Sequence, residues 1–235
     1  MNRKEHVFNI EKKFKYEVIQ CFLNSVIYTD YFHFKNNIKI KKHPEILILD
    51  GVSSIESVSH AAGKTALLVF ADPFLCGGLY FQGATTQEEK VCDETTLYNI
   101  LFRFKKHGYY NLNKIICEAS KVDYNKNCIY IPDVRILSTN QTINIIHCAA
   151  PNANYESNTS IEMARQIALI HKVACENNIN TLILGMFGCG AFENDPQMVG
   201  SIFKKEFETS YIDKIIFPIY ESDEYKKNEF LKGLV

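Results

Sequence analysis

Two uninterrupted apolar runs constrain the fold of this chain more than any other feature of its sequence. Residues 65–71 read TALLVFA and residues 181–186 read TLILGM. Runs of this length, apolar at almost every position, are typical of strands buried on both faces, as in a parallel sheet that helices cover on each side. Each run is followed by a glycine-containing loop and then by a helical pattern. The sequence therefore predicts an α/β protein.

The rest of the chain alternates helical and extended patterns in the same way. Helices are expected where apolar residues recur at three- and four-residue spacing, and strands where short apolar runs lie between polar turns. The expected helices span residues 3–24, 53–63, 86–104, 159–177 (entered through 157–160), 196–208 and 223–232. The further expected strands span residues 26–31, 46–49, 114–117, 128–137, 142–149 and 213–220. This order implies βαβ crossovers and one largely parallel sheet covered on both faces.

Composition and charge exclude several classes of protein. The 235 residues are 46% hydrophobic, which is too high for a disordered chain and sufficient for a buried core. The formal net charge of −1 argues against a general nucleic-acid-binding protein, which usually carries a basic stripe. No uncharged run approaches the roughly 18 apolar residues of a membrane span, and the charged N-terminal segment does not fit a signal peptide.

The cysteines and histidines give no sign of a metal site. The eight cysteines are scattered along the chain without a CxxC pair, and the seven histidines do not cluster with them. This pattern favours reduced, buried thiols in a cytoplasmic protein with no bound metal and no cofactor. The sequence has no internal repeat and no linker rich in proline or serine, so one structural domain is expected.

Two loops are the candidate ligand-binding elements. Residues 72–89 follow the first apolar run and residues 186–196 follow the second, and each loop leads into a helix. In an open α/β sheet, ligands bind beyond the carboxyl ends of the strands. Glycines there let the backbone approach a ligand, and a helix N-terminus favours a phosphate. Neither loop matches a P-loop or GxGxxG, and each alone could simply form tight turns. Two such loops that converge favour a diphosphate ligand.

The triplet Gln87-Glu88-Glu89 begins the helix after the first loop, and it has two interpretations. Thr85-x-x-Glu88 and Thr86-x-x-Glu89 are overlapping capping boxes, of which only one can operate. If Thr85 is the N-cap, Glu88 caps the helix, and Glu89 projects about 100° further around it, free to face the loop. Spacing alone leaves both a structural and a catalytic role open.

Several segments, taken together and in this order, resemble a known family. They are Cys76-Gly77-Gly78 followed after eight residues by Gln87-Glu88-Glu89, with Gly83-Ala84 between them, then Thr96-Leu97-Tyr98, Ile131-Pro132-Asp133-Val134, Ala149-Ala150-Pro151-Asn152, and Gly188-Cys189-Gly190-Ala191-Phe192 with Asn194-Asp195-Pro196. Residues from about 50 to 220 thereby resemble the microbial-type poly(ADP-ribose) glycohydrolase family of the macrodomain superfamily. That family's signature is three glycines, six to eight residues, and Gln-Glu-Glu.

The resemblance implies a three-layer α/β/α macrodomain-like fold with a mixed, largely parallel sheet. Residues 50–235 would form the catalytic part, and residues 1–49 a helical extension that packs on it within one structural domain. The expected ligands are ADP-ribose, poly(ADP-ribose) or ADP-ribosylated proteins, with no nucleic acid or membrane partner, and the expected state is a monomer.

The resemblance also implies a role for each matching residue. Glu89 would be the catalytic acid and base, and Glu88 would bind the ribose hydroxyls at the scissile end. Phe192 would pack on the distal ribose. The other expected substrate-binding residues are Gln87, Cys76, Gly77 and Gly78 beside the ribose and diphosphate, and Gly188, Cys189, Gly190 and Ala191 in the second loop, where backbone N–H groups would bind the diphosphate.

The implied reaction is hydrolysis of the O-glycosidic bond at the ribose anomeric carbon through an oxocarbenium-like transition state. The alternative is a module that binds ADP-ribose or a related nucleotide without hydrolysis. Cys76 stands where the family has its first glycine, and its thiol could narrow the site or change the accepted leaving group. A nucleophilic role for Cys76 is disfavoured because no histidine neighbours it in sequence. Phe187 stands where the family usually has tryptophan, and the linkage that is cleaved stays open.

Overall fold

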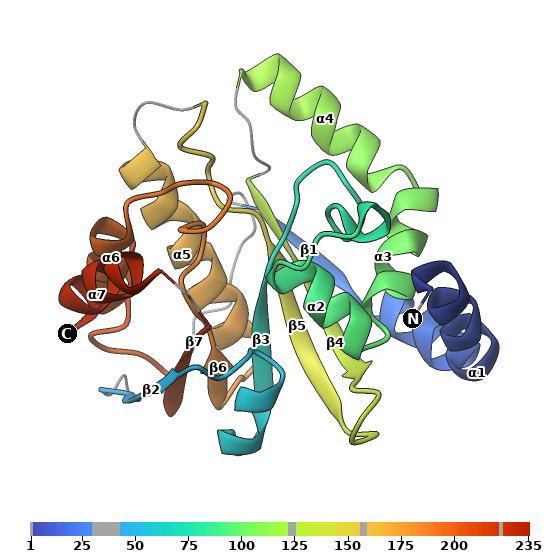
Figure 1. Ribbon diagram of the computed structural model, residues 1–235, viewed down its shortest axis with the longest axis horizontal. Coiled ribbons are helices and arrows are strands. Elements are labelled where there is room, and N and C mark those ends of the chain that lie inside the picture. The colour runs from blue at the N-terminus through green and yellow to red at the C-terminus, as the bar shows by residue number, and fades with distance from the viewer. Residues whose placement is uncertain (1, 30–42, 122–125, 156–158, 221–222) are drawn as a thin grey trace.

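Seven strands form one mixed sheet in the computed structural model, which describes residues 2–29, 43–121, 126–155, 159–220 and 223–235 (Figure 1). The strand order is β1-β4-β5-β3-β6-β7-β2. β4 runs antiparallel to β1 and to β5, and the remaining neighbours are parallel. The strands are β1 (Val26–Thr29), β2 (Glu45–Asp50), β3 (Thr65–Phe70), β4 (Asn127–Arg135), β5 (Thr142–Cys148), β6 (Thr181–Ile183) and β7 (Lys214–Ile219). The predicted mixed, largely parallel sheet is confirmed.

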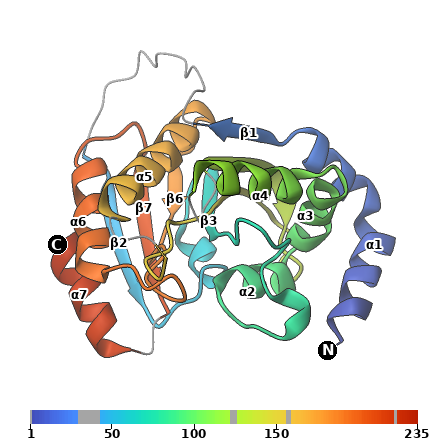
Figure 2. The same ribbon diagram turned by 90° about the horizontal axis from the view of Figure 1, so that it is seen from above.

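Helices cover both faces of the sheet, which confirms the three-layer α/β/α fold (Figures 1 and 2). Side chains alternate along β3, so that Ala66 and Leu68 enter the core under α5, α6 and α7, whereas Leu67 and Val69 enter the core under α1 to α4. The helices are α1 (Arg3–Leu23), α2 (Gln87–Glu94), α3 (Leu97–Lys106), α4 (Tyr109–Ser120), α5 (Thr159–Glu176), α6 (Pro196–Glu206) and α7 (Glu224–Leu234), with short 3-10 helices η1 (Glu56–His60) and η2 (Tyr80–Gln82).

The helix expected over residues 86–104 is two helices, because Thr95 interrupts it. Thr95 has extended backbone angles and forms an isolated bridge to Ile136 beside β4. Its hydroxyl donates to the carbonyl of Val91 at 2.7 Å and accepts from the N–H of Leu97 at 3.1 Å. One buried threonine thus ends α2 and starts α3.

The strand expected at residues 114–117 is wrong, since these residues lie within α4. Tyr109, Tyr110, Asn113 and Cys117 are buried and recur at helical spacing, whereas the isoleucines that suggested a strand, 115 and 116, are 62% and 49% exposed. A short apolar run is ambiguous between strand and helix. Here the helical spacing of the buried residues over the whole of α4 determines the structure, and the short apolar run within it does not.

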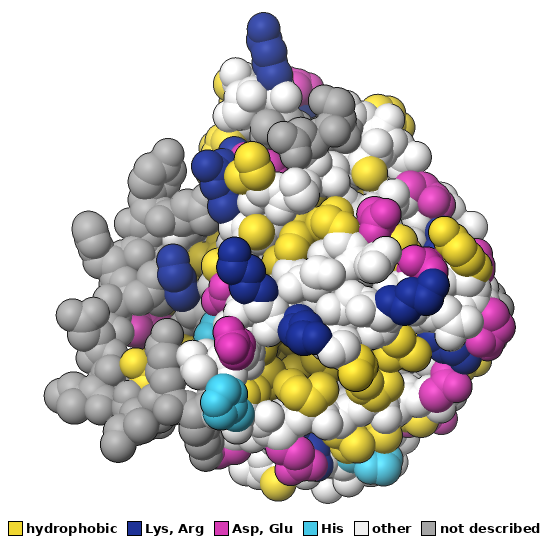
Figure 3. Space-filling model, turned by 90° about the vertical axis from the view of Figure 1, so that its left-hand side faces the viewer, with side chains coloured by type: hydrophobic (Ala, Val, Ile, Leu, Met, Phe, Trp, Pro, Cys, Tyr) yellow, Lys and Arg dark blue, Asp and Glu magenta, His cyan; other side chains and the backbone are white. Residues whose placement is uncertain are grey.

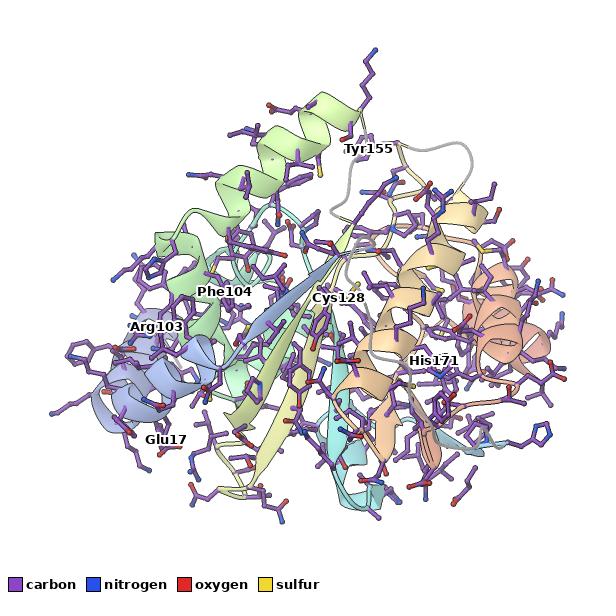
Figure 4. All side chains as sticks on the ribbon, turned by 180° about the vertical axis from the view of Figure 1, so that it is seen from behind. Glu17, Arg103, Phe104, Cys128, Tyr155 and His171 are labelled. Atoms are coloured by element: carbon purple, nitrogen blue, oxygen red, sulfur yellow. The ribbon has the colours of Figure 1, made fainter. Side chains whose placement is uncertain are left out.

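The N-terminal segment contributes to the sheet as well as covering it. In α1, Glu11 accepts a hydrogen bond at 2.7 Å from Arg103 of α3, and the rings of Phe22 and Phe104 have centroids 4.9 Å apart (Figure 4). The segment also supplies β1 and β2, the two edge strands. The division expected after residue 49 therefore falls inside β2. Residues 30–31 of the expected first strand and residues 157–158 of the expected helix entry lie outside the described residues.

The parallel strands bring several chain segments to one edge of the sheet. The first loop follows β3, residues 149–152 follow β5, the second loop follows β6, and Tyr220 follows β7.

On the side that carries α6 and α7, basic and acidic side chains are interspersed (Figure 3). In the part of the chain that is described, no helix combines the length and the apolar character needed to cross a membrane.

Candidate functional site

A cavity of about 370 Å³ lies where the first and second loops meet. The end of β3, the start of α2 and the residues after β7 complete its walls. Among the residues that line this cavity, the charged ones are all acidic: Asp72, Glu88 and Glu89. The lining includes Phe70, Asp72, Gly78, Leu79, Thr86, Gln87, Glu88, Glu89, Gly188, Gly190, Ala191, Phe192, Pro218 and Tyr220.

Gly78 brings the first loop against the two glutamates. It has a φ of +61°, and its N–H donates to the carbonyl of Leu75 at 3.1 Å in a tight turn. A Cβ at this position would clash with Oε1 of Glu89 and lie 3.1 Å from Oε2 of Glu88. Glycine is therefore required both by the backbone conformation and by the close approach of the carboxylates.

Glu89 is 3% exposed and is held by two donors from the first loop. Its Oε1 accepts from the N–H of Leu79 at 2.9 Å, and its Oε2 accepts from the hydroxyl of Thr86. The N-cap of α2 is Thr86, and its side chain does not cap the helix. The arrangement with Thr85 as N-cap is thus wrong, but Glu89 still faces the loop, because Thr86 uses its hydroxyl to hold the carboxylate.

Glu88 is 2% exposed and points toward the sheet. Its Oε1 lies 2.8 Å from Nε2 of His147 on β5, and its Oε2 accepts from the N–H of Asp72 at 2.9 Å. Burial raises the pKa of Glu88, and the bonds from His147 and from the Asp72 amide offset part of that rise. The carboxylate of Asp72 accepts from the N–H groups of Phe74 and Leu75, both at 2.8 Å, and burial raises its pKa.

Gln87 fastens the start of α2 to the end of β3. Its Oε1 accepts from the N–H of Phe70 at 3.0 Å, and its Nε2 donates to the carbonyl of Leu68 at 2.8 Å and to Oγ of Ser54 at 3.2 Å. The amide therefore has partners within the protein at both ends. Gln87 lines the cavity and fixes the position from which the two glutamates project.

The second loop offers backbone donors to the cavity. Within the described residues, the N–H groups of Gly188, Gly190 and Ala191 have no protein acceptor. The N–H of Cys189, in contrast, donates to the carbonyl of Met186 at 3.1 Å, and the Cys189 side chain is fully buried. Free backbone N–H groups in a glycine loop suit an anion such as a diphosphate. Cys189 is thus a packing residue of this loop in the structure.

The side-chain amide of Asn194 holds the second loop by hydrogen bonds to backbone carbonyls. Its Nδ2 donates to the carbonyls of Pro151 at 2.8 Å and of Gly188 at 2.9 Å. Gly188 has a φ of +75°, and a Cβ there would lie 2.7 Å from the Cβ of Ala150. These contacts tie the second loop to the residues that follow β5.

Cys76 and Gly77 belong to the first loop but are not among the residues that line the cavity. Cys76 is 9% exposed and belongs to the hydrophobic core cluster that contains Tyr98 and Tyr110. A Cβ on Gly77 would lie 2.8 Å from the ring of Tyr98. The thiol therefore does not narrow the cavity. Burial raises the pKa of Cys76 to about 12, which agrees with an unreactive thiol rather than a nucleophile.

Two residues of the site had no role in the sequence analysis. His147 lies at the carboxyl end of an apolar strand. A lone histidine in such a strand is the sequence signal that could have identified it. Tyr220 follows β7, is 65% exposed and lines the cavity. The ammonium group of Lys90 lies 4.1 Å from the centroid of the Tyr220 ring.

A group of hydrogen-bonded side chains centred on His171 lies away from the cavity. His171 on α5 contacts Oε1 of Glu206 through Nδ1 and Oγ of Ser210 through Nε2, both at 2.7 Å (Figure 4 labels His171). This order resembles a serine–histidine–acid triad, but Ser210 is fully buried and lies outside the residues that line the cavity. Burial lowers the pKa of His171, but the side chains of Cys175 and Glu206 outweigh it and raise the pKa to about 9. The cluster fastens α5 to α6.

The described residues contain no group of three or more histidine, cysteine, aspartate or glutamate side chains that could hold a metal ion.

Comparisons with known proteins identify the fold and a family. The family model for the catalytic domain of microbial-type PARG, or poly(ADP-ribose) glycohydrolase, matches residues 2–139. The poly(ADP-ribose) glycohydrolase of Thermomonospora curvata superposes with a TM-score of 0.74 at 19% identity, covering 92% of this chain and 88% of that one. The same enzyme bound to the inhibitor ADP-HPD gives 0.72 at 20% identity, covering 92% and 87%.

A second bacterial structure has the same fold. The poly(ADP-ribose) glycohydrolase of Deinococcus radiodurans in complex with ADP-ribose superposes with a TM-score of 0.75 at 20% identity, covering 92% of this chain and 96% of that one. A search of curated proteins finds no match. Because the identities are only 19% and 20%, these superpositions show a likeness of fold.

Proposed function

Since this chain belongs to the microbial-type poly(ADP-ribose) glycohydrolase family, we propose that it binds ADP-ribose and hydrolyses the O-glycosidic bond at the distal ribose. The products are free ADP-ribose and the shortened polymer or the protein side chain from which it is released. The observation that carries the proposal is the pair Glu88 and Glu89, both buried and both lining a cavity between two glycine loops.

The donors and walls of the cavity support one orientation of the ligand. The diphosphate lies against the second loop, where the N–H groups of Gly188, Gly190 and Ala191 are free to donate. Phe192 lines the cavity and packs on the distal ribose, and Gly78 allows the sugar to approach the carboxylates. Because the charged side chains that line the cavity are acidic, the phosphates depend on backbone donors rather than on ion pairs.

Glu89 is the acid and then the base of the reaction. Its carboxyl proton passes to the glycosidic oxygen, the bond from that oxygen to the anomeric carbon breaks, and the ribose carries the positive charge of an oxocarbenium-like transition state. A water molecule then adds to the anomeric carbon and returns a proton to Glu89. The N–H of Leu79 and the hydroxyl of Thr86 fix the carboxylate, so that it does not need to reorient between the two steps.

Glu88 binds the ribose rather than transferring protons. One of its oxygens contacts His147 and the other accepts from the Asp72 amide, and a carboxylate oxygen has room for more than one donor. The hydroxyls of the distal ribose supply the further donors. This role explains why both glutamates are needed although one group carries out the proton transfer.

The non-catalytic alternative has lost its support. It depended on a first loop altered by Cys76, but that thiol is buried and does not line the cavity, whereas the two carboxylates do. We further propose that the protein is a cytoplasmic monomer that acts on poly(ADP-ribose) or ADP-ribosylated proteins. All eight cysteines are free thiols, which is typical of proteins in a reducing compartment.

The test is incubation of the purified protein with labelled poly(ADP-ribose) and, separately, with ADP-ribosylated protein. We expect free ADP-ribose from at least one substrate, separated by chromatography and quantified. The Gly190→Glu variant, which places a charged side chain among the backbone donors, is the negative control. Binding of ADP-ribose without its release over hours at micromolar enzyme would refute the proposal and establish the non-catalytic alternative.

A further inference from the structure

One buried polar contact joins the site to the centre of the sheet. Nε2 of His147 lies 2.8 Å from Oε1 of Glu88, and the side chains are 2% and 3% exposed. A carboxylate can only accept hydrogen bonds, so the nitrogen that faces an ionised Glu88 carries the proton. With Glu88 ionised, the contact is a charge-assisted hydrogen bond shielded from water, which makes it stronger than a surface pair.

The position of His147 in the sheet explains why it reaches Glu88. β5 is an interior strand, and His147 is opposite Val69 on β3 and Ile129 on β4. Side chains alternate along a strand, so His147 shares a face with Ile143 and Ile145, in the layer that α2 covers. A histidine on this apolar face costs free energy unless it is bonded, and Glu88 is the partner that satisfies it.

The two oxygens of Glu88 face different ways. Oε1 faces the sheet and His147, whereas Oε2 faces the first loop, where it accepts from the Asp72 amide and lies 3.1 Å from the position of a Cβ on Gly78. A carboxylate bonded at one oxygen from the sheet and at the other from the loop cannot rotate without breaking one of these bonds. The edge that it presents to the cavity is therefore fixed before a ligand arrives.

We propose that His147 is a positioning residue of the reaction, which holds Glu88 so that it presents its free lone pairs to the hydroxyls of the distal ribose. This inference rests on the proposed function. His147 does not line the cavity and does not touch the substrate, so it acts only through Glu88.

The test is a double-mutant cycle on the release of ADP-ribose from poly(ADP-ribose). His147→Leu removes the donor, His147→Gln keeps an N–H donor of similar reach without the imidazole, and Glu88→Gln removes the charged acceptor. Each His147 variant is made alone and with Glu88→Gln. Ile145→Val, on the same strand and face, is the control for a change in the core that does not contact Glu88. Thermal melting of every variant is recorded with its kcat/KM.

We expect His147→Leu to lower kcat/KM by about tenfold or more and His147→Gln to restore most of it, because a donor is regained. With Glu88→Gln present, His147→Leu should cause no further loss beyond about twofold. Full activity in a folded His147→Leu variant would overturn the proposal, as would an equal loss with and without Glu88→Gln. If His147→Leu does not fold, His147→Met, which also removes the donor, is measured in the two backgrounds and decides in the same way.

The experiment distinguishes this inference from the proposed function. If the wild-type protein releases no ADP-ribose, the proposed function fails, and the affinity for ADP-ribose measured by calorimetry replaces kcat/KM in the same cycle. A loss of affinity in His147→Leu that disappears with Glu88→Gln present would then still support the positioning role. Independent losses of affinity would refute it.

Discussion

Gly78→Ala provides a sharp test of how the first loop serves the carboxylates. The added methyl group would clash with Oε1 of Glu89, the oxygen that accepts from the N–H of Leu79 at 2.9 Å. The carboxylate is the flexible end of a side chain, so it is expected to move rather than the backbone. That movement breaks the bond to Leu79 and takes Glu89 out of line with the glycosidic oxygen. We therefore expect a loss of activity that exceeds the loss of stability.

The magnitudes follow from the two effects separately. An alanine with φ near +60° costs about 1–2 kcal/mol, which lowers the melting temperature by about 2–8 °C in a chain of this size. Misplacing a general acid costs about 10²–10⁴ in rate. Gly83→Ala is the matched control, because Gly83 lies in the same loop with a φ of +89° and nothing lies within 4 Å of its Cβ position. It should lose comparable stability and keep most of its turnover.

The assay measures release of ADP-ribose under saturating polymer, together with melting of both variants. The expected result is similar melting for Gly78→Ala and Gly83→Ala and a difference in kcat of about a hundredfold or more. Equal turnover in the two variants would refute the reasoning, since it would mean that the contact between Gly78 and Glu89 does not matter for the reaction.

Three further predictions test other parts of the site and the fold. Gly190→Glu should fold, because nothing lies within 4 Å of a Cβ at Gly190, but it should abolish the binding of ADP-ribose measured by calorimetry, and unchanged binding would remove the second loop from the site. Thr86→Val should lower kcat by about tenfold without weakening ADP-ribose binding, because it removes the hydroxyl that holds Glu89, and an unchanged kcat would show that this bond is dispensable. The raised pKa of His171, about 9 against 6.5, stabilises the fold fully below pH 6.5, and this contribution of about 3 kcal/mol is lost as the pH rises through 9. Cys175 and Glu206 raise this pKa together, so Glu206→Gln should reduce that decline in urea unfolding between pH 6 and 10, and an unchanged decline would contradict the contribution of Glu206.

The layers of the fold could be predicted from the sequence because strands buried on both faces are recognisable as uninterrupted apolar runs. The runs at 65–71 and 181–186 are apolar at both odd and even positions, and the amphipathic helices between them have one apolar stripe. The failures occurred where a short segment was ambiguous. Ile115 and Ile116 favoured a strand locally, and Thr95 broke a periodic pattern by a hydrogen bond that no spacing encodes.

The composition of the site could be predicted only in part. The two loops and the glutamates were found because glycines and carboxylates stand at the ends of strands and the starts of helices. Which of these residues face the cavity depends on tertiary packing: Cys76 and Cys189 were expected to contact substrate, but both are buried and neither lines the cavity. His147 lies 59 residues from Glu88 in sequence, and its role follows only from the pairing of β5 with its neighbours.

The most direct test of the central claim is the turnover of Glu89→Gln, measured beside its affinity for ADP-ribose. Glutamine keeps the size of the side chain, its Oε1 can accept from the N–H of Leu79, and its Nε2 can donate to the hydroxyl of Thr86, but it cannot deliver a carboxyl proton. The account predicts near-normal melting, ADP-ribose affinity close to that of the wild-type protein, and release of ADP-ribose from polymer slowed by about a hundredfold or more. A Glu89→Gln variant that releases ADP-ribose at the wild-type rate would contradict the account, and Asp72 would then be the next carboxyl group to test.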